Sequence, residues 1–69
     1  MVVTIKPANK RDMNSFIMEA WKHGVEVQRM AGDMLEFTGY EDKINFVIEK
    51  YPATIIHKEL SKIVRGDEL

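Results

Sequence analysis

The residues best suited to chemistry are two histidines, His23 and His57, and two serines, Ser15 and Ser61. A catalytic histidine needs a nucleophile, a second base or a ligand held within hydrogen-bond reach. The sequence contains no H-x-x-x-H or H-E-x-x-H pattern, and neither serine lies in a glycine-flanked nucleophile elbow. Cysteine is absent, which excludes thiolate chemistry. We therefore expect no catalytic residue and no metal site, and we predict that the protein is not an enzyme.

The four glycines do not form a phosphate-binding loop. Neither G-x-G-x-x-G nor G-x-x-x-x-G-K-[ST] occurs, and each glycine is explained by a turn or by the end of a helix. We therefore expect no cofactor.

Two segments at the start of the chain have distinct patterns. Residues 2–6 are mostly β-branched and predict a strand that Pro7 ends, with Val3 and Ile5 on one face. Asn9 is a good N-cap, and we expect a helix from there to His23 and Gly24. Its apolar stripe consists of Met13, Phe16, Ile17, Ala20 and Trp21.

Residues 25–38 predict a β-hairpin that turns at residues 31–33, because their apolar side chains alternate with a period of two. One face carries Val25, Val27, Leu35 and Phe37. The other face is mostly polar and carries Glu26, Gln28, Met30, Met34 and Glu36. We therefore expect a sheet with one covered face and one open face.

A second helix is predicted over about residues 39–51. Thr38 and Glu41 have the spacing of a capping box, and Pro52 follows as a stop signal. Its apolar stripe consists of Ile44, Val47, Ile48 and Tyr51.

The last segment has two interpretations. Residues 54–57 are β-prone and favour a fourth strand, whereas Ile56, Leu60, Ile63 and Val64 also have the spacing of a third helix. With the strand, the element order βαββαβ resembles the ferredoxin-like α+β arrangement, in which two helices cover one face of a four-stranded antiparallel sheet. With the helix, the order is βαββαα. Either way, we predict one domain over residues 1–65 and a polar tail at residues 66–69.

Length and charge limit the classes of function. The 69 residues are enough for one domain, and 10 basic against 11 acidic residues give a net charge of -1. No global positive field attracts nucleic acid or an anionic membrane. No apolar run reaches the length of a membrane span, and we expect a small cytoplasmic domain.

Several apolar residues lie where the predicted core cannot use them. Met18 and Phe46 fall off their helix stripes, and Met30 and Met34 flank the hairpin turn beside Glu36. Methionine is flexible and polarisable, which suits it to binding surfaces. The leading hypothesis is a protein-binding module that docks on a larger protein or associates with itself. A chain this short is typical of an accessory regulator or inhibitor, including those of bacteriophages.

Two alternatives remain. The first is nucleic-acid binding through two local basic clusters, which consist of Lys6, Lys10 and Arg11 and of Lys58, Lys62 and Arg65. The second is regulation by a small ligand bound at a dimer interface, at Gly24 and the adjoining loop between helix and strand.

Overall fold

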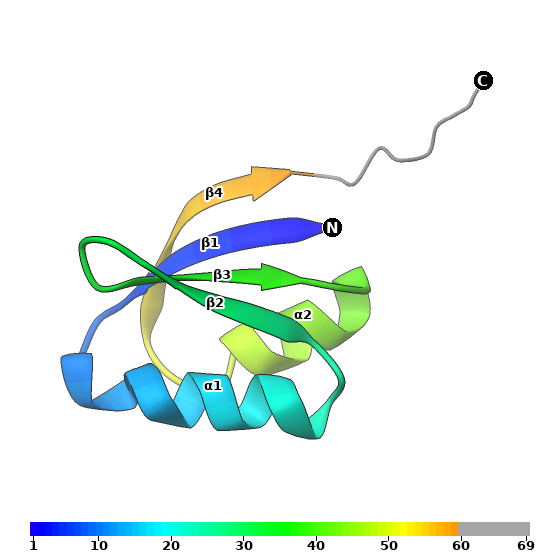
Figure 1. Ribbon diagram of the computed structural model, residues 1–69, viewed down its shortest axis with the longest axis horizontal. Coiled ribbons are helices and arrows are strands. Elements are labelled where there is room, and N and C mark those ends of the chain that lie inside the picture. The colour runs from blue at the N-terminus through cyan, green and yellow to red at the C-terminus, as the bar shows by residue number, and fades with distance from the viewer. Residues whose placement is uncertain (60–69) are drawn as a thin grey trace.

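The computed structural model describes residues 1–59, which form four strands and two helices (Figure 1). A short 3-10 turn, η1, precedes the first helix. In chain order the elements are β1 (Val2–Pro7), η1 (Lys10–Asp12), α1 (Met13–Lys22), β2 (Glu26–Met30), β3 (Met34–Thr38), α2 (Glu41–Ile48) and β4 (Ala53–Glu59).

The four strands form one antiparallel sheet in the order β2-β3-β1-β4. This order and the sequence of elements confirm the ferredoxin-like prediction. Residues 53–59 are a strand, so the helical interpretation of this segment is wrong over those residues. They pair with β1 along its whole length, which satisfies the backbone of a β-prone segment. Leu60, Ile63 and Val64 lie outside the described residues, as does the predicted domain boundary at residue 65.

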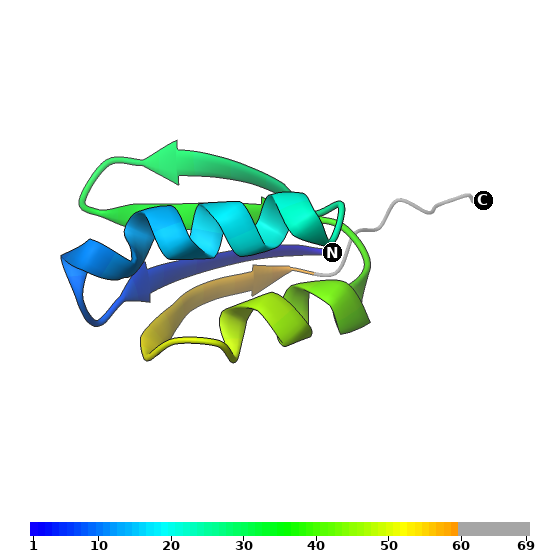
Figure 2. The same cartoon turned by 90° about the horizontal axis from the view of Figure 1, so that it is seen from below.

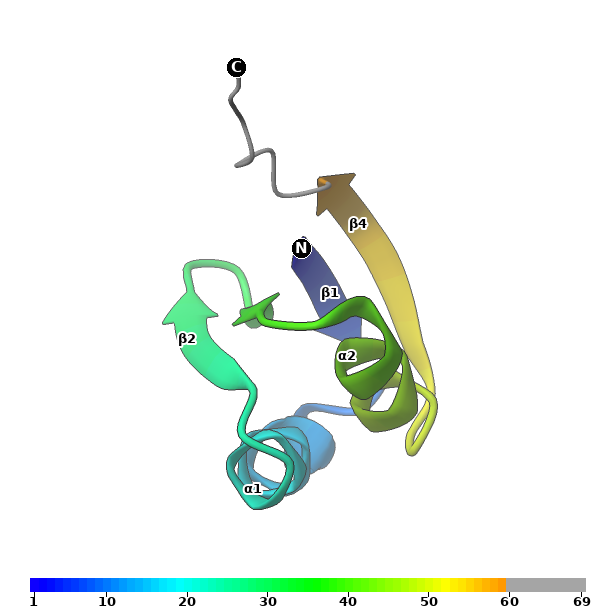
Figure 3. The ribbon, with the colours of Figure 1, turned by 90° about the vertical axis from the view of Figure 1, so that its right-hand side faces the viewer.

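Both helices cover the same face of the sheet (Figures 2 and 3). Alternation along β1 and β3 points Val3, Ile5, Leu35 and Phe37 toward the helices, and all four are fully buried. Phe16 of α1 lies among them, with its ring centroid 6.3 Å from that of Phe37. Ile44 and Val47 of α2 are also fully buried and complete the core. No helix of residues 1–59 lies on the opposite side of the sheet, and we call this side the open face.

The expected turns are present. Gly24 has a φ of 72° and follows α1, as predicted for a left-handed helix cap. The hairpin turns at residues 31–33, where Gly32 and Asp33 have φ values of 82° and 60°. Aspartate is one of the few non-glycine residues that adopts this conformation.

The predicted helix starts are partly wrong. Asn9 precedes the 3-10 turn η1, its side chain makes no cap hydrogen bond, and the α-helix begins at Met13. The capping box is absent, because Thr38 is used as the last residue of β3, where it pairs with Val2 and Glu26. The second helix therefore begins at Glu41 rather than at residue 39 and ends at Ile48 rather than at residue 51.

Trp21 is not part of the core, contrary to the prediction from the helix stripe. Its side chain is 69% exposed, whereas Met13, Phe16 and Ala20 are buried. Trp21 lies at the edge of the stripe and helps to line a surface hollow with residues of β2, the edge strand of the sheet. In the described part of the chain β2 is the edge of the sheet, so no further strand provides a surface that would bury the ring.

Candidate protein-binding surface

Cross-strand pairing arranges the side chains of the open face in rows. Gln28 pairs with Glu36, Glu36 with Thr4, and Thr4 with His57, so that one polar row crosses all four strands. Directly paired residues of antiparallel strands share a face, so each row lies on one side of the sheet. The predicted polar face of the hairpin thus forms half of a larger surface to which β1 and β4 contribute the rest.

Met30 and Met34 form an apolar pair at the hairpin end of this face. They are directly paired across β2 and β3, next to the row that contains Glu36. Met30 is 38% exposed and Met34 is partly buried. The structure therefore brings together three of the five residues predicted for a protein interface: Met30, Met34 and Glu36.

Met18 and Phe46 lie in the helical layer, on the other side of the sheet. Met18 is 60% exposed on α1 and Phe46 is 49% exposed on α2. The ring of Phe46 contacts His23 edge-on, with 4.8 Å between ring centroids, and the Lys50 Nζ lies 4.3 Å from its centre. The sheet separates these two residues from the methionine pair, so the five predicted residues do not form one continuous surface.

The open face is hollowed between β2 and β3. A shallow hollow of about 80 Å³ is lined by Glu26, Val27, Gln28, Glu36 and Thr38, and we call it the acidic hollow. Within residues 1–59, neither Glu26 nor Glu36 has a basic nitrogen at ion-pairing distance. The hollow therefore presents two carboxylates without a cationic partner in the described part of the chain.

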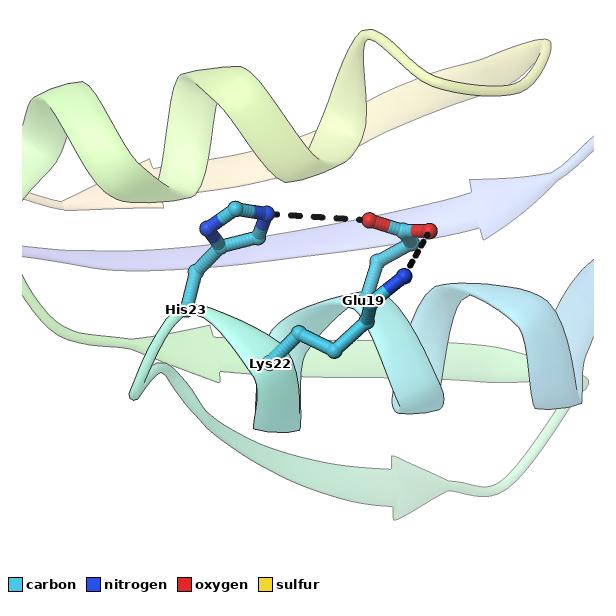
Figure 4. Close-up of polar contacts among 3 residues, drawn as sticks. All are labelled: Glu19, Lys22 and His23. Atoms are coloured by element: carbon cyan, nitrogen blue, oxygen red, sulfur yellow. Dashed lines mark ion pairs between the residues drawn. The ribbon is translucent and has the colours of Figure 1, made fainter.

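His23 is held at the end of α1 by contacts that explain its position (Figure 4). Its Nε2 lies 3.7 Å from the Glu19 Oε1, and the Lys22 Nζ lies 3.6 Å from the Glu19 Oε2. His57 is exposed on β4, with its Nε2 3.4 Å from the Glu59 Oε1. Each histidine faces one carboxylate, and residues 1–59 contain no group of three side chains that could hold a metal ion.

The residues of the nucleic-acid alternative are spread over the molecule. Lys6 shares the open face with Thr54, and Lys10 and Arg11 lie in the turn η1. Lys58 pairs with Val3, which places it on the helix-covered face of the sheet. Lys62 and Arg65 lie outside the described residues.

The loop around Gly24 lines a second hollow of the surface. It is an open hollow of about 550 Å³, and its other lining residues are Trp21, Val25, Glu26 and Val27. The small-ligand alternative had placed its site at this loop, but Trp21 was predicted to lie in the apolar stripe of the helix rather than beside Gly24.

Three more exposed apolar residues were missed. Tyr40 is 76% exposed before α2, and Ile55 and Ile56 of β4 are each 51% exposed. The isoleucines follow no alternating pattern because the register of β4 shifts between His57, which pairs with Thr4, and Ile55, which pairs with Ile5, so that Ile56 has no partner on β1. The exposure of an edge strand depends on sheet order, which single-chain patterns do not reveal.

No family model, curated protein or solved structure is significantly similar to this chain. None of the helices in residues 1–59 combines the length and the apolar character needed to cross a bilayer.

Proposed function

We propose that this protein is a non-enzymatic protein-binding domain that docks a partner on its open sheet face. The observation that carries the proposal is the methionine pair of exposed Met30 and partly buried Met34, beside Glu36 on a face that no helix of residues 1–59 covers. Adaptable apolar side chains next to hydrogen-bonding groups are what a docking surface requires. The domain acts as a small accessory regulator or inhibitor of the protein that it binds.

The absence of cysteine fits a reducing compartment, and we place this role in the cytoplasm. Nucleic-acid binding is a weaker proposal, because the basic residues of the described part do not share a face and no Phe, Tyr or Trp of residues 1–59 pairs into the rows of the open face to stack on a base.

The test compares two exposed methionines. Met30→Asp adds a charge to the proposed docking surface, whereas Met18→Asp adds the same charge to the helical layer. Immobilised wild-type and variant proteins are used for affinity capture from lysate, with the bound proteins quantified by mass spectrometry. We expect Met30→Asp to lose a partner that the wild type and Met18→Asp both retain. Identical capture by all three proteins would contradict the proposal, provided that circular dichroism shows all three to be folded.

Regulation by a small ligand is a second candidate, favoured by the hollow at Gly24. Trp21 lines this hollow and is the only tryptophan of the chain, so its fluorescence reports directly on binding there. A metabolite screen that leaves the Trp21 emission unchanged would contradict this candidate.

A further inference from the structure

The acidic hollow has the size and chemistry of a site for one basic side chain. Its volume of about 80 Å³ is lined by Glu26, Gln28, Glu36 and Thr38, together with Val27 of the edge strand. Glu26 pairs with Thr38 and Gln28 pairs with Glu36, so oxygen atoms surround the hollow from two neighbouring strands. Arginine and lysine form their strongest hydrogen bonds with carboxylates in such an arrangement.

Thr4 gives an independent sign that the open face is incomplete without a ligand. Its side chain is on the open face directly beside Glu36, yet the residue is only 9% exposed. Within residues 1–59, no side-chain hydrogen bond to its hydroxyl group is formed. Buried polar groups are nearly always hydrogen-bonded, and an unpaired one calls for a partner.

The charge of the open face favours a cationic partner. Glu26, Glu36 and Glu59 lie on it. Of the described residues, Lys6 and His57 face the same side, and the His57 Nε2 lies 3.4 Å from the Glu59 Oε1, so Glu26 and Glu36 are the acids of this face without a basic group at ion-pairing distance within residues 1–59. An acidic surface attracts a basic segment and repels the phosphates of a nucleic acid.

We propose that the docked partner is a basic amphipathic segment of another protein, which places a lysine or arginine in the acidic hollow and an apolar side chain on Met30 and Met34. This inference rests on the proposed function, and it names the chemistry of the partner. Glu36 and Met34 are two residues apart on β3, which corresponds to about 7 Å along a strand. Residues four positions apart on a helix are separated by about 6 Å along its axis, so a basic and an apolar residue at positions i and i+4 come near this spacing.

A second copy of this chain is a poorer partner, because pairing of β2 with β2 of the other copy supplies no cation to the acidic hollow. If the two strands pair about Val27, Glu26 lies opposite Gln28 of the other copy; if they pair about Gln28, Glu26 lies opposite Met30. Neither arrangement brings a cation to Glu26, so we commit to a basic segment of a different protein.

The test uses three fluorescein-labelled helical peptides with the same leucine stripe. Their polar faces consist of lysine, glutamate or serine. Binding to the full-length chain is measured by fluorescence anisotropy at low and at high salt. We expect the lysine–leucine peptide alone to bind, with an affinity that falls as salt rises.

Two double variants with the same change in net charge identify the site. Glu26→Gln with Glu36→Gln removes the carboxylates of the acidic hollow, whereas Glu41→Gln with Glu49→Gln removes two exposed carboxylates at the ends of α2. We expect the first pair to weaken binding of the lysine–leucine peptide by roughly tenfold or more, because two charge-assisted contacts are lost. The second pair should leave the affinity within about twofold, since its charges lie in the other layer.

The outcomes separate this inference from the proposed function. Any of three results would overturn the inference: the lysine and serine peptides bind equally, the two double variants have equal effects, or the lysine–leucine peptide does not bind. If binding is independent of peptide charge but is lost in Met30→Asp, the proposed function stands and the basic partner does not. If Met30→Asp changes nothing, the docking surface itself is wrong. Dimerisation in sedimentation that Glu36→Gln abolishes would assign the face to a second copy instead.

Discussion

At the scale of single residues, the buried hydroxyl group of Thr4 is a feature that lowers stability but can serve binding. It lies in the middle of the sheet on β1, where a valine would fill the same space without a polar atom. No side chain or backbone group of residues 1–59 forms a hydrogen bond with its hydroxyl group, and a buried hydroxyl group that lacks one costs free energy. A binding surface can tolerate this cost if the partner supplies the missing hydrogen bond.

This account predicts that Thr4→Val stabilises the unbound domain. We expect the free energy of unfolding to rise by about 1 kcal/mol, because an unsatisfied polar group is replaced by an apolar one of similar shape. Urea denaturation followed by circular dichroism gives the value. A loss of stability in Thr4→Val would show that the hydroxyl group already has a partner in the free protein.

The positions of individual side chains are harder to predict from the sequence than the order of the elements. Alternation correctly predicted that Val3, Ile5, Leu35 and Phe37 face the core, because one covered sheet face imposes a period of two. The same logic placed Trp21 in the core, but burial at the edge of a stripe depends on whether a neighbouring strand lies beneath it. Alternation also placed Glu26, Gln28 and Glu36 on one face, as the structure has them, but the hollow among them depends on the register of β2 against β3, which alternation does not determine.

At the scale of elements, the end of α1 determines where β2 begins. The Val25 N–H donates to the Ala20 carbonyl at 2.8 Å and the Gly24 N–H donates to the Trp21 carbonyl at 3.3 Å. These are the two hydrogen bonds of a Schellman motif, and Val25 is buried against the core directly after it. The cap thus couples the helix end to the edge strand that carries Glu26 and Met30.

We predict that Gly24→Ala destabilises the domain by about 1 kcal/mol, because an alanine is strained at a φ of 72°. No atom lies within 4 Å of the added Cβ, so the loss is due to the backbone alone. Thermal unfolding monitored by circular dichroism measures it.

Gly24→Asn is the matched variant, and it should lose less stability because asparagine adopts this conformation more readily. Equal losses for alanine and asparagine would contradict the backbone explanation.

The element order was predictable because each segment carries its own signal: β-branched runs for strands, apolar stripes for helices and Gly24 for a helix end. The exact start of the second helix was not predictable, because Thr38 has the spacing of an N-cap but is paired with Val2 as the last residue of β3. Strand pairing satisfies the whole backbone of Thr38, whereas a side-chain cap satisfies one N–H group, and the pairing prevails.

At the scale of the whole molecule, the two sides of the sheet have different roles. The helical side contains the core and the contacts among Glu19, His23 and Phe46, which join α1 to α2. The open face carries the methionine pair and the acidic hollow, which contribute little to the core. The net charge of -1 does not reveal that the acidic hollow is on one side of the sheet, because the basic residues Lys10, Arg11 and Lys50, which lie away from the open face, offset its charge in the total.

The central claim, that the open face is the docking surface, is tested most directly by the NMR signals of methionine methyl groups. Met30 and Met34 lie on the open face, Met18 is exposed on α1, and Met13 is buried in the core. The full-length protein labelled with 13C at these methyl groups is titrated with the lysine–leucine peptide. We predict that the Met30 and Met34 signals shift while those of Met18 and Met13 stay in place. A shift of Met18 with Met30 and Met34 unchanged would contradict the account.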